Sequence, residues 1–335
     1  MLKINIKIVE KIKTNKYKDL MKILITGGCG YVGSVLIPKL LLDGHHIISV
    51  DTKWFGDYLP KHKRLKNIKS DISDISNLNI RKIDCCIHLA SIANDPMAEL
   101  DKSLSWETSA LNTYNLMEFL KKIKTKRIIY ASSGSVYGIS EKAKVSENTP
   151  LKPISLYNKV KMVTERVILS YSKSIEVFIV RPATVCGYSP RMRLDVTVNA
   201  LTFSALQNKE IKVFGGKQVR PNIHIDDMCD IYRFFLQANK KYRGTYNAGF
   251  ENKSILDIAK FVKKIIPSKI NIFKDRSDPR SYRLDSTKII KAGFKPKKKI
   301  LNAINELSEK YSNGILKQEA NFHSLKWLKK IIKKN

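Results

Sequence analysis

Short apolar runs recur along the first half of the chain, and each is followed by small or polar residues. These runs lie at 23–26, 46–50, 85–89, 127–130 and 176–180. Residues 106–121 and 157–172, between the runs, instead have apolar residues at helical spacing. Buried strands that alternate with amphipathic helices are typical of a parallel sheet covered on both faces. The pattern therefore predicts an α/β fold built on a doubly wound parallel sheet.

The pattern is less regular after Pro190. Glycines at 215 and 216 and prolines at 221, 279 and 296 interrupt shorter elements, which predicts a smaller, mixed lobe that holds a substrate. We therefore divide the chain into an N-terminal extension outside the fold (1–20), a sheet domain (21–180), a region that is mainly the smaller lobe (181–315) and a basic C-terminal helix (316–335).

The C-terminal helix has an apolar face and a lysine-rich face. Its apolar residues are Leu325, Leu328, Ile331 and Ile332. Such a helix either packs on the domain beside it or lies on a membrane surface. No apolar run approaches the ~20 residues that a membrane-spanning helix needs, and the first 20 residues are too polar for a secretory signal. These features predict a cytoplasmic protein.

The first apolar run leads into a glycine-rich turn, KILITGGCGYVGS, at 22–34. Gly27, Gly30 and Gly33 are spaced three residues apart in it. Glycine lets a ligand approach the backbone closely, and the helix start that follows offers free N–H groups. A strand, a glycine turn and a helix start together predict a site for a dinucleotide pyrophosphate, although three glycines alone also occur in ordinary turns.

The second apolar run ends at Asp51, where a dinucleotide site of this kind has an acid. Its carboxylate would accept both hydroxyls of an adenosine ribose. The same charge would repel a 2'-phosphate, so Asp51 favours NAD over NADP, with Lys53 softening the repulsion. The alternative interpretation of Asp51 is a solvated loop acid.

Composition agrees with a soluble globular enzyme, since 43% of the 335 residues are hydrophobic. The net charge of +32 comes mostly from lysines scattered along the chain, which is typical of a solvated surface rather than of a nucleic-acid interface. This charge favours an anionic small substrate. Cysteines lack metal-ligand spacing, so we expect no metal and reduced, buried thiols at Cys29, Cys85, Cys86, Cys186 and Cys229.

Tyr157 and Lys161 lie four residues apart at the start of a predicted helix, so their side chains project from one face. A tyrosine hydroxyl is a poor base near neutral pH, but an adjacent ammonium favours the phenolate. Ser133 follows a strand and would hydrogen-bond the same substrate oxygen. Taken alone, the pair is more typical of a packed tyrosine and a solvated lysine, but its position after the strand that ends in ASSGSVYG favours the catalytic interpretation.

In this order the motifs resemble those of the extended short-chain dehydrogenase/reductase family, and most closely its NAD-dependent nucleotide-sugar epimerases and dehydratases. The motifs are TGGCGYVGS, Asp51, SDIS, HLAS, ASSGSVYG, YNKVK and RPATVCG, and the resemblance covers residues 21–312. It implies a Rossmann-type sheet with bound NAD and a smaller mixed C-terminal lobe for a nucleoside-diphosphate sugar. It also implies a homodimer formed through the helices at 106–121 and 157–172.

The resemblance further implies roles for individual residues. The catalytic residues would be Ser133, Tyr157 and Lys161. Besides Tyr157 and Lys161, the cofactor would be bound by Gly27, Gly30, Tyr31, Val32, Gly33, Asp51, Asp71, Ile72, Leu89, Ala90, Ser91 and Ser109. The substrate would be bound by Ser133, Thr184, Arg191, Arg193, Asn199, Arg220 and Arg280. Arginine suits a diphosphate because its fork makes paired bonds to phosphate oxygens, but these four arginines are also compatible with loop charges or surface ion pairs.

The chain departs from the family pattern directly after Ser133. Sugar 4,6-dehydratases of the family have an Asp–Glu pair there, whereas this chain has Gly134 and Ser135. Neither can exchange a proton near neutral pH, so dehydration is disfavoured. Ser109 and Thr184 replace family asparagines, and Cys186 replaces a tyrosine, which leaves the sugar open.

The sequence thus predicts an NAD-dependent epimerase or oxidoreductase that acts on a nucleoside-diphosphate sugar, with Tyr157-assisted hydride transfer at C4. The SPRMRLD segment at 189–195 resembles that of enzymes for unusual sugars of surface polysaccharides. A non-epimerising 4-dehydrogenase or a keto-sugar reductase fits the same residues, because the outcome depends on how freely the intermediate turns. A more remote alternative is an RNA-binding or regulatory member of the fold.

Overall fold

The computed structural model describes residues 20–139, 144–273 and 281–333. Its largest element is a seven-stranded parallel sheet with the strand order β10-β6-β5-β4-β1-β2-β3. The strands are β1 (Lys22–Thr26), β2 (His46–Asp51), β3 (Leu65–Lys69), β4 (Cys85–His88), β5 (Arg127–Ala131), β6 (Glu176–Pro182) and β10 (Gly244–Ala248). The prediction of a doubly wound parallel sheet is confirmed, and the five apolar runs are five of its strands.

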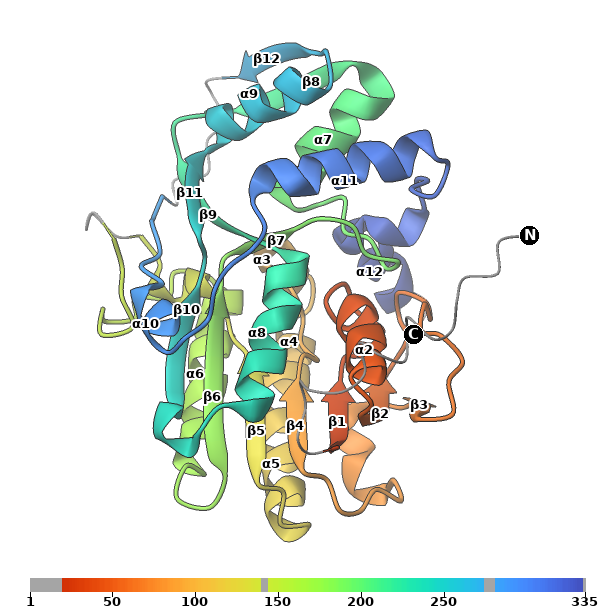
Figure 1. The fold of residues 1–335 in the computed structure, drawn as a ribbon, viewed down its shortest axis with the longest axis vertical. Coiled ribbons are helices and arrows are strands. Elements are labelled where there is room, and N and C mark those ends of the chain that lie inside the picture. Colours follow the sequence, from red (N-terminus) through yellow and green to blue (C-terminus); the bar gives the residue numbers. More distant parts are fainter. Residues whose placement is uncertain (1–19, 140–143, 274–280, 334–335) are drawn as a thin grey trace, which may run out of the picture.

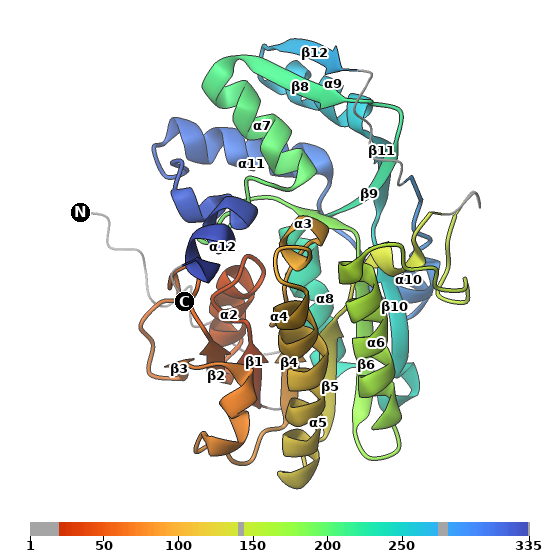
Figure 2. The ribbon, with the colours of Figure 1, turned by 180° about the vertical axis from the view of Figure 1, so that it is seen from behind.

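Helices cover both faces of this sheet (Figures 1 and 2). One face is covered by α2 (Gly33–Leu42) and α8 (Ile225–Gln237). The other is covered by α4 (Lys102–Trp106), the π-helical η2 (Glu107–Leu111), α5 (Asn112–Lys122) and α6 (Leu156–Ser170), with the 3-10 helix η1 (Ile72–Asn77) beside them. The predicted helix at 106–121 is therefore built from three consecutive segments, and the one at 157–172 is α6.

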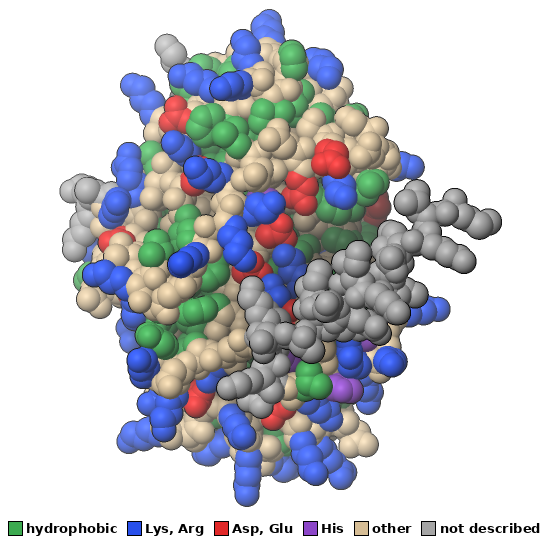
Figure 3. Space-filling view, viewed as in Figure 1, with side chains coloured by type: hydrophobic (Ala, Val, Ile, Leu, Met, Phe, Trp, Pro, Cys, Tyr) green, Lys and Arg blue, Asp and Glu red, His purple; other side chains and the backbone are tan. Residues whose placement is uncertain are grey.

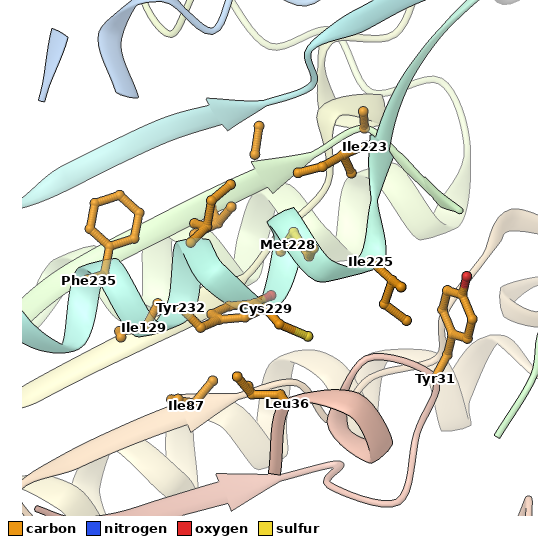
Figure 4. Packing of buried hydrophobic residues seen from close by; sticks show 14 of the residues in the cluster. Tyr31, Leu36, Ile87, Ile129, Ile223, Ile225, Met228, Cys229, Tyr232 and Phe235 are labelled. Carbon is orange, nitrogen blue, oxygen red and sulfur yellow. The ribbon is translucent and has the colours of Figure 1, made fainter. Parts of the chain in front are cut away.

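Apolar spacing explains how α8 is held on the sheet. Ile225, Met228, Tyr232 and Phe235 recur at helical spacing, and each is at most 1% exposed. Figure 4 shows Tyr232 beside Ile129 of β5, and Ile225 directed towards Tyr31. Burying one such side chain stabilises the fold by roughly 1.5–3 kcal/mol, so one face of α8 is enough to fix it.

The smaller lobe lies above the carboxyl ends of the parallel strands (Figure 1). Its three-stranded sheet contains β7 (Thr184–Cys186), β9 (Val219–His224) and β11 (Glu251–Ser254), and its two-stranded sheet contains β8 (Glu210–Phe214) and β12 (Lys269–Phe273). Helices α7 (Thr197–Asn208), α9 (Ile255–Ile265) and α11 (Ile300–Ser312) pack beside them around a separate apolar cluster. The lobe therefore has a core of its own.

The chain returns to the large sheet within the region predicted to be mainly the smaller lobe. After β9 it forms α8 and then β10, which pairs with β6, and α10 (Thr287–Lys291) packs on β10. β10 has the sequence GTYNA and β3 has LKNIK. Both strands lack a continuous apolar run, which is why the hydrophobic pattern misses them.

The C-terminal segment packs beside the sheet domain. It contains η5 (Ala320–Phe322) and α12 (Ser324–Ile332), and α12 contacts α3 (Asp95–Ala98). Leu328 is fully buried in a cluster with Ile92 and Met97. The apolar face of α12 is thus covered by the protein itself, which favours the packed-helix interpretation. In the residues that the structure describes, no helix is long and apolar enough to cross a membrane.

Candidate functional site

A cavity of about 640 Å³ lies between the sheet domain and the smaller lobe. Its walls come from the glycine turn, the loops that follow β2, β4 and β5, the start of α6, and residues 182–197. Ligands of doubly wound sheets bind at the carboxyl ends of the strands, where the strand order reverses. Here that point lies between β1 and β4, so the cavity stands where the topology predicts a site.

Glycine is required at two positions of the turn by close backbone contacts. Gly27 has a φ of +73°, and a Cβ there would lie 2.6 Å from the Ala90 nitrogen. A Cβ at Gly33 would lie 2.3 Å from the Gly28 oxygen. Helix α2 begins at Gly33 without a side-chain cap. The Ser34 and Val35 nitrogens donate to the Gly30 and Val32 carbonyls, whereas the Gly33 nitrogen has no hydrogen-bond partner in the described residues and is open to an anion. The turn fits the predicted diphosphate site.

Backbone N–H groups fix the orientation of Asp51 at the end of β2. The Cys29 nitrogen donates to Oδ2 at 2.9 Å, and the Lys53 nitrogen donates to Oδ1 at 2.6 Å. Burial still raises the pKa of Asp51. The ammonium of Lys53 lies 2.7 Å from Asp57, so it is directed to that acid and does not supply the free positive charge that would accommodate a 2'-phosphate.

Most of the other predicted cofactor residues line the same cavity. They are Gly30, Tyr31, Val32, Asp71, Ile72, Leu89, Ala90 and Ser91. Ser109 instead lies behind the wall, where it is 2% exposed and its hydroxyl is 3.2 Å from that of Ser91. Its position in a π-helical turn directs it towards this internal contact.

The three predicted catalytic residues meet in the middle of the cavity. Ser155 caps α6 by accepting from the Asn158 nitrogen at 3.2 Å, which places Tyr157 in the first helical turn. Lys161, one turn later, donates from Nζ to the Ala131 carbonyl at 2.8 Å and lies 5.9 Å from the Tyr157 ring centroid. The Ser133 side chain lies close enough to the Tyr157 phenol to affect its pKa.

Burial dominates the ionisation of this group. It raises the pKa of Tyr157, and the opposing effect of the Ser133 side chain offsets only part of this shift. Burial also lowers the pKa of Lys161 to about 7, against an opposing effect of the Glu165 charge. In the protein without its cofactor, burial therefore outweighs the interactions that favour the Tyr157 phenolate.

A buried ion pair between Glu165 and Arg181 connects α6, the helix of Tyr157 and Lys161, to β6. This pair was not predicted from the sequence. Glu165 accepts from Arg181 Nη2 at 2.6 Å and Nε at 2.9 Å, and from the Ser132 hydroxyl at 2.5 Å. Arg181 also donates to the Tyr137 hydroxyl at 2.8 Å. The available signal was the spacing of Glu165 four residues after Lys161, which places both on the inner face of α6.

The residues that were predicted to bind the substrate do not all line the cavity. Thr184, Arg191, Arg193 and Arg220 line the cavity, whereas Arg280 lies outside the described residues. Asn199 is fully buried and absent from the wall.

Asn199 is a structural link between the two lobes. It donates from Nδ2 to the Tyr31 hydroxyl at 3.0 Å and accepts from the Gly187 nitrogen at 3.0 Å. Tyr31 in turn donates to the Gly187 carbonyl at 2.7 Å. Figure 4 shows the Tyr31 ring at the edge of the apolar cluster. These contacts join the glycine turn to the smaller lobe.

Two further parts of the wall had no sequence signal. Trp54 and Phe55 follow Asp51, and Ser324 and Leu325 come from the start of α12. The Trp327 indole nitrogen donates to the Trp54 carbonyl at 2.6 Å, which fastens α12 to this loop. Trp54 and Trp327 are 273 residues apart in the sequence, so only the folded structure shows this contact.

Metal ligands and thiols add nothing to the site. Within the described ranges, no group of three or more histidine, cysteine or acidic side chains is arranged to hold a metal ion. The five cysteines are buried and unpaired.

Lysine and arginine side chains spread over the face shown in Figure 3, among apolar and acidic ones, instead of gathering in one patch.

Comparison with known proteins gives consistent matches. The model of the NAD dependent epimerase/dehydratase family matches residues 23–249. UDP-glucuronic acid decarboxylase 1 of Danio rerio is 28% identical over an alignment of 328 residues, and the match covers 92% of this chain and 77% of that protein. The uncharacterized UDP-glucose epimerase YtcB of Bacillus subtilis is 30% identical over 277 residues, 76% of this chain and 86% of that protein.

A solved structure matches at a similar level. The UDP-glucuronic acid 4-epimerase of Bacillus cereus, in complex with UDP-glucuronic acid and NAD, has a TM-score of 0.77 and 28% identity. The match covers 88% of this chain and 99% of that one. Since decarboxylases and epimerases both appear among the similar proteins, overall similarity does not select the reaction.

Proposed function

Because the chain belongs to the NAD dependent epimerase/dehydratase family, we propose that it inverts the C4 carbon of a nucleoside-diphosphate sugar. The observation that carries the proposal is that one cavity is lined by the glycine turn, Asp51 and the catalytic group of Ser133, Tyr157 and Lys161. The complex of the Bacillus cereus relative with UDP-glucuronic acid and NAD supports a sugar nucleotide as the second ligand.

Residues around the glycine turn fit the dinucleotide. A Cβ at Gly27 would collide with the backbone of Ala90, so glycine lets the turn pack against the loop after β4, and Gly27 lines the cavity. Asp51, held by two backbone N–H groups, would accept the adenosine ribose hydroxyls, and Asp71 and Ile72 would flank the adenine. When bound, NAD supplies the acceptor and then the donor of the hydride at the sugar carbon.

Tyr157 would carry the proton in this reaction. Its hydroxyl would take the proton of the C4 hydroxyl during oxidation and return it during reduction, with Ser133 bonded to the same oxygen. Since burial raises the pKa of Tyr157, the phenol is the resting form. Loss of its proton therefore requires further positive charge nearby, which the oxidised cofactor carries.

A chain of side-chain hydrogen bonds would orient Ser133 for this step. The Ser135 hydroxyl donates to Asn158 Oδ1 at 2.7 Å, so the Ser133 hydroxyl, 2.7 Å from that of Ser135, donates to Ser135. The Ser133 oxygen, which also accepts from the Ser135 nitrogen at 3.1 Å, keeps one lone pair that would accept from the Tyr157 phenol. This arrangement suits a resting state in which Tyr157 is protonated.

The surroundings of Gly134 support epimerisation over 4,6-dehydration. A Cβ at this position would lie 2.9 Å from Leu284 Cδ1 and 3.1 Å from the Pro182 oxygen. An acidic side chain would thus displace its neighbours. Without an acid on the 3-10 helix η3 (Gly134–Tyr137), the residues after Ser133 offer no group to protonate a leaving hydroxyl.

We also propose a homodimer formed through α4–α5 and α6. Trp106, Leu111 and Tyr114 are 38%, 55% and 48% exposed on consecutive turns of the helical segment at 102–122. Large exposed apolar side chains that gather on one face mark interaction surfaces. Figure 2 shows this segment and α6 side by side on one face of the molecule, where a second copy would cover both.

The test of the reaction uses Tyr157→Phe. The wild-type chain is incubated with NAD and with UDP-glucose, UDP-glucuronic acid or UDP-N-acetylglucosamine, and the products are identified by NMR. We expect the variant to lose roughly 10²- to 10⁴-fold in turnover of the accepted sugar while binding NAD normally. Undiminished turnover by the variant would contradict the mechanism. A free keto sugar with reduced cofactor would instead assign the chain as a dehydrogenase.

A further inference from the structure

Arg191 is a buried cation without an acidic hydrogen-bond partner in the part of the chain that the structure describes. It is 3% exposed, and its guanidinium carbon lies 4.3 Å from the Phe55 ring centroid. Nη1 donates to the Met192 carbonyl at 3.0 Å, and Nη2 donates to the Ser324 hydroxyl at 3.0 Å. Nε is buried and has no hydrogen-bond partner there. A buried charge in this state is costly until an anion binds it.

The next arginine along the chain is in a different situation. Arg193 makes two bonds with Asp195, at 3.0 and 3.1 Å, so that carboxylate is already engaged. Burial, together with the nearby charge of Arg193, lowers the pKa of Arg191 to about 10. Arg191 is still charged at neutral pH, and it lines the cavity. It therefore offers a positive charge to a ligand in the cavity, and its hydrogen-bonding capacity is not fully used within the protein.

The contacts around Arg191 place it on the dinucleotide side of the cavity. The Ser189 hydroxyl donates to the Tyr31 carbonyl at 2.7 Å, which fastens the segment that carries Arg191 to the glycine turn. Phe55, the ring beneath the guanidinium, follows Asp51 by four residues. Asp51 itself acts electrostatically on Arg191. With the dinucleotide placed as proposed, its diphosphate would be the anion beside these residues.

We propose that Arg191 binds the diphosphate bridge of the dinucleotide and that Ser324, in the C-terminal segment, holds the guanidinium in position for it. The N–H group of Gly33, which has no hydrogen-bond partner in the described residues, would supply a neutral donor at the start of α2 for the same site. A sugar nucleotide also contains a diphosphate. Arg191 lies over Phe55, close in sequence to the proposed ribose-binding Asp51, and this position favours the diphosphate of the cofactor. The proposal rests on the cofactor part of the proposed function and is independent of the sugar carbon that reacts.

The C-terminal segment is therefore a positioning element for the cofactor. Ser324 is 1% exposed and lies 133 residues after Arg191 in the chain. Asn321, three residues earlier, donates from Nδ2 to the Phe55 carbonyl at 2.8 Å. One short segment thus fixes both the ring beneath the guanidinium and the hydroxyl beside it.

The experiment compares the wild-type chain with Arg191→Met after removal of bound nucleotide. Methionine keeps an unbranched side chain over Phe55 but removes the charge. We expect the dissociation constant of NAD, from isothermal titration calorimetry, to rise roughly 10- to 100-fold, as for loss of a hydrogen bond to a charged group. The dissociation constant of UDP should change less than about twofold. The nucleotide-free variant should also melt at a higher temperature than wild type, because an unpaired buried charge is gone, and gain little from added NAD.

Matched variants separate this role from a structural one. Arg166→Met removes an exposed arginine of α6, and it should leave both dissociation constants unchanged. Ser324→Ala should weaken NAD binding roughly 3- to 10-fold, and Ser324→Thr, which keeps the hydroxyl, should restore it. This pair tests the same contact if Arg191→Met does not fold.

Three results would overturn the inference. In the first, Arg191→Met binds NAD as wild type does, and in the second its loss is confined to UDP. In the third, Ser324→Ala and Ser324→Thr bind NAD equally well. A wild-type chain that binds no NAD would instead contradict the cofactor part of the proposed function, and this inference with it.

Discussion

Replacing Glu165 by glutamine removes the negative charge that faces the buried Arg181 guanidinium. In the wild-type chain the Glu165 and Arg181 side chains are 2% and 7% exposed, and two hydrogen bonds join them. The amide of glutamine would keep one acceptor oxygen but would turn an N–H₂ group towards an arginine nitrogen. Arg181 would then be a buried charge facing a donor.

The expected loss of stability is large. Breaking a buried ion pair by removing one partner costs about 3–5 kcal/mol, because the remaining charge is desolvated without compensation. Glu165→Gln should lose a value in this range, a large part of the 5–15 kcal/mol that usually stabilises a folded protein. A double variant, Glu165→Leu with Arg181→Met, removes both charges and should be more stable than Glu165→Gln.

Urea denaturation followed by circular dichroism measures these free energies of unfolding. Glu176→Gln is the matched control, since its partner Arg127 also donates to three backbone carbonyls, at 2.6, 2.7 and 2.9 Å. That guanidinium stays satisfied, and we expect a loss of about 1 kcal/mol. The reasoning would be refuted if Glu165→Gln lost no more than this control, or if the double variant were the least stable of the set.

Three further predictions concern the site and the assembly. The free energy of unfolding should rise by up to about 2 kcal/mol between pH 7 and 9 through Lys161, and this rise should vanish in Lys161→Met. The pKa of Lys161 is lowered to about 7 in the folded chain, so in this range the unfolded chain binds more protons; an equal rise in both proteins would contradict this. Asp51→Asn should raise the dissociation constant of NAD roughly tenfold and reduce the difference between the dissociation constants of NAD and NADP. If calorimetric titrations give unchanged dissociation constants, Asp51 does not bind the cofactor. Leu111→Glu should convert a dimer into a monomer in sedimentation velocity runs, while Leu42→Glu, at a residue 87% exposed on α2, should not; a dimer that survives Leu111→Glu would place the interface elsewhere.

Local sequence patterns predict those features whose cause is local. A continuous apolar run such as Cys85–His88 identifies a strand buried on both faces. The spacing of Gly27 and Gly33 reflects backbone contacts within one turn and the next loop. The four-residue separation of Tyr157 and Lys161 is a property of one helix. The sheet, the glycine turn and the start of α6 could therefore be derived from sequence.

Features that depend on contacts between distant segments could not be derived in this way. The amide side chain of Asn199 has the hydrogen-bonding groups that a substrate ligand needs, but it is buried and bonded to Tyr31 and Gly187. Ser324 meets Arg191 only because α12 packs beside the loop after β2. The ionisation of Tyr157 depends on burial, which the sequence does not give. In each case tertiary packing decides the role.

The central claim is that this chain removes hydride from C4 of a nucleotide sugar and returns it to the opposite face. The most direct measurement incubates the NAD-loaded protein with UDP-sugars that carry deuterium at C4 and follows the products by NMR. The account predicts the C4 epimer of the accepted sugar with its deuterium still at C4, and no product from Tyr157→Phe. An unconverted sugar in every case, or an epimer whose deuterium has exchanged with solvent, would contradict it.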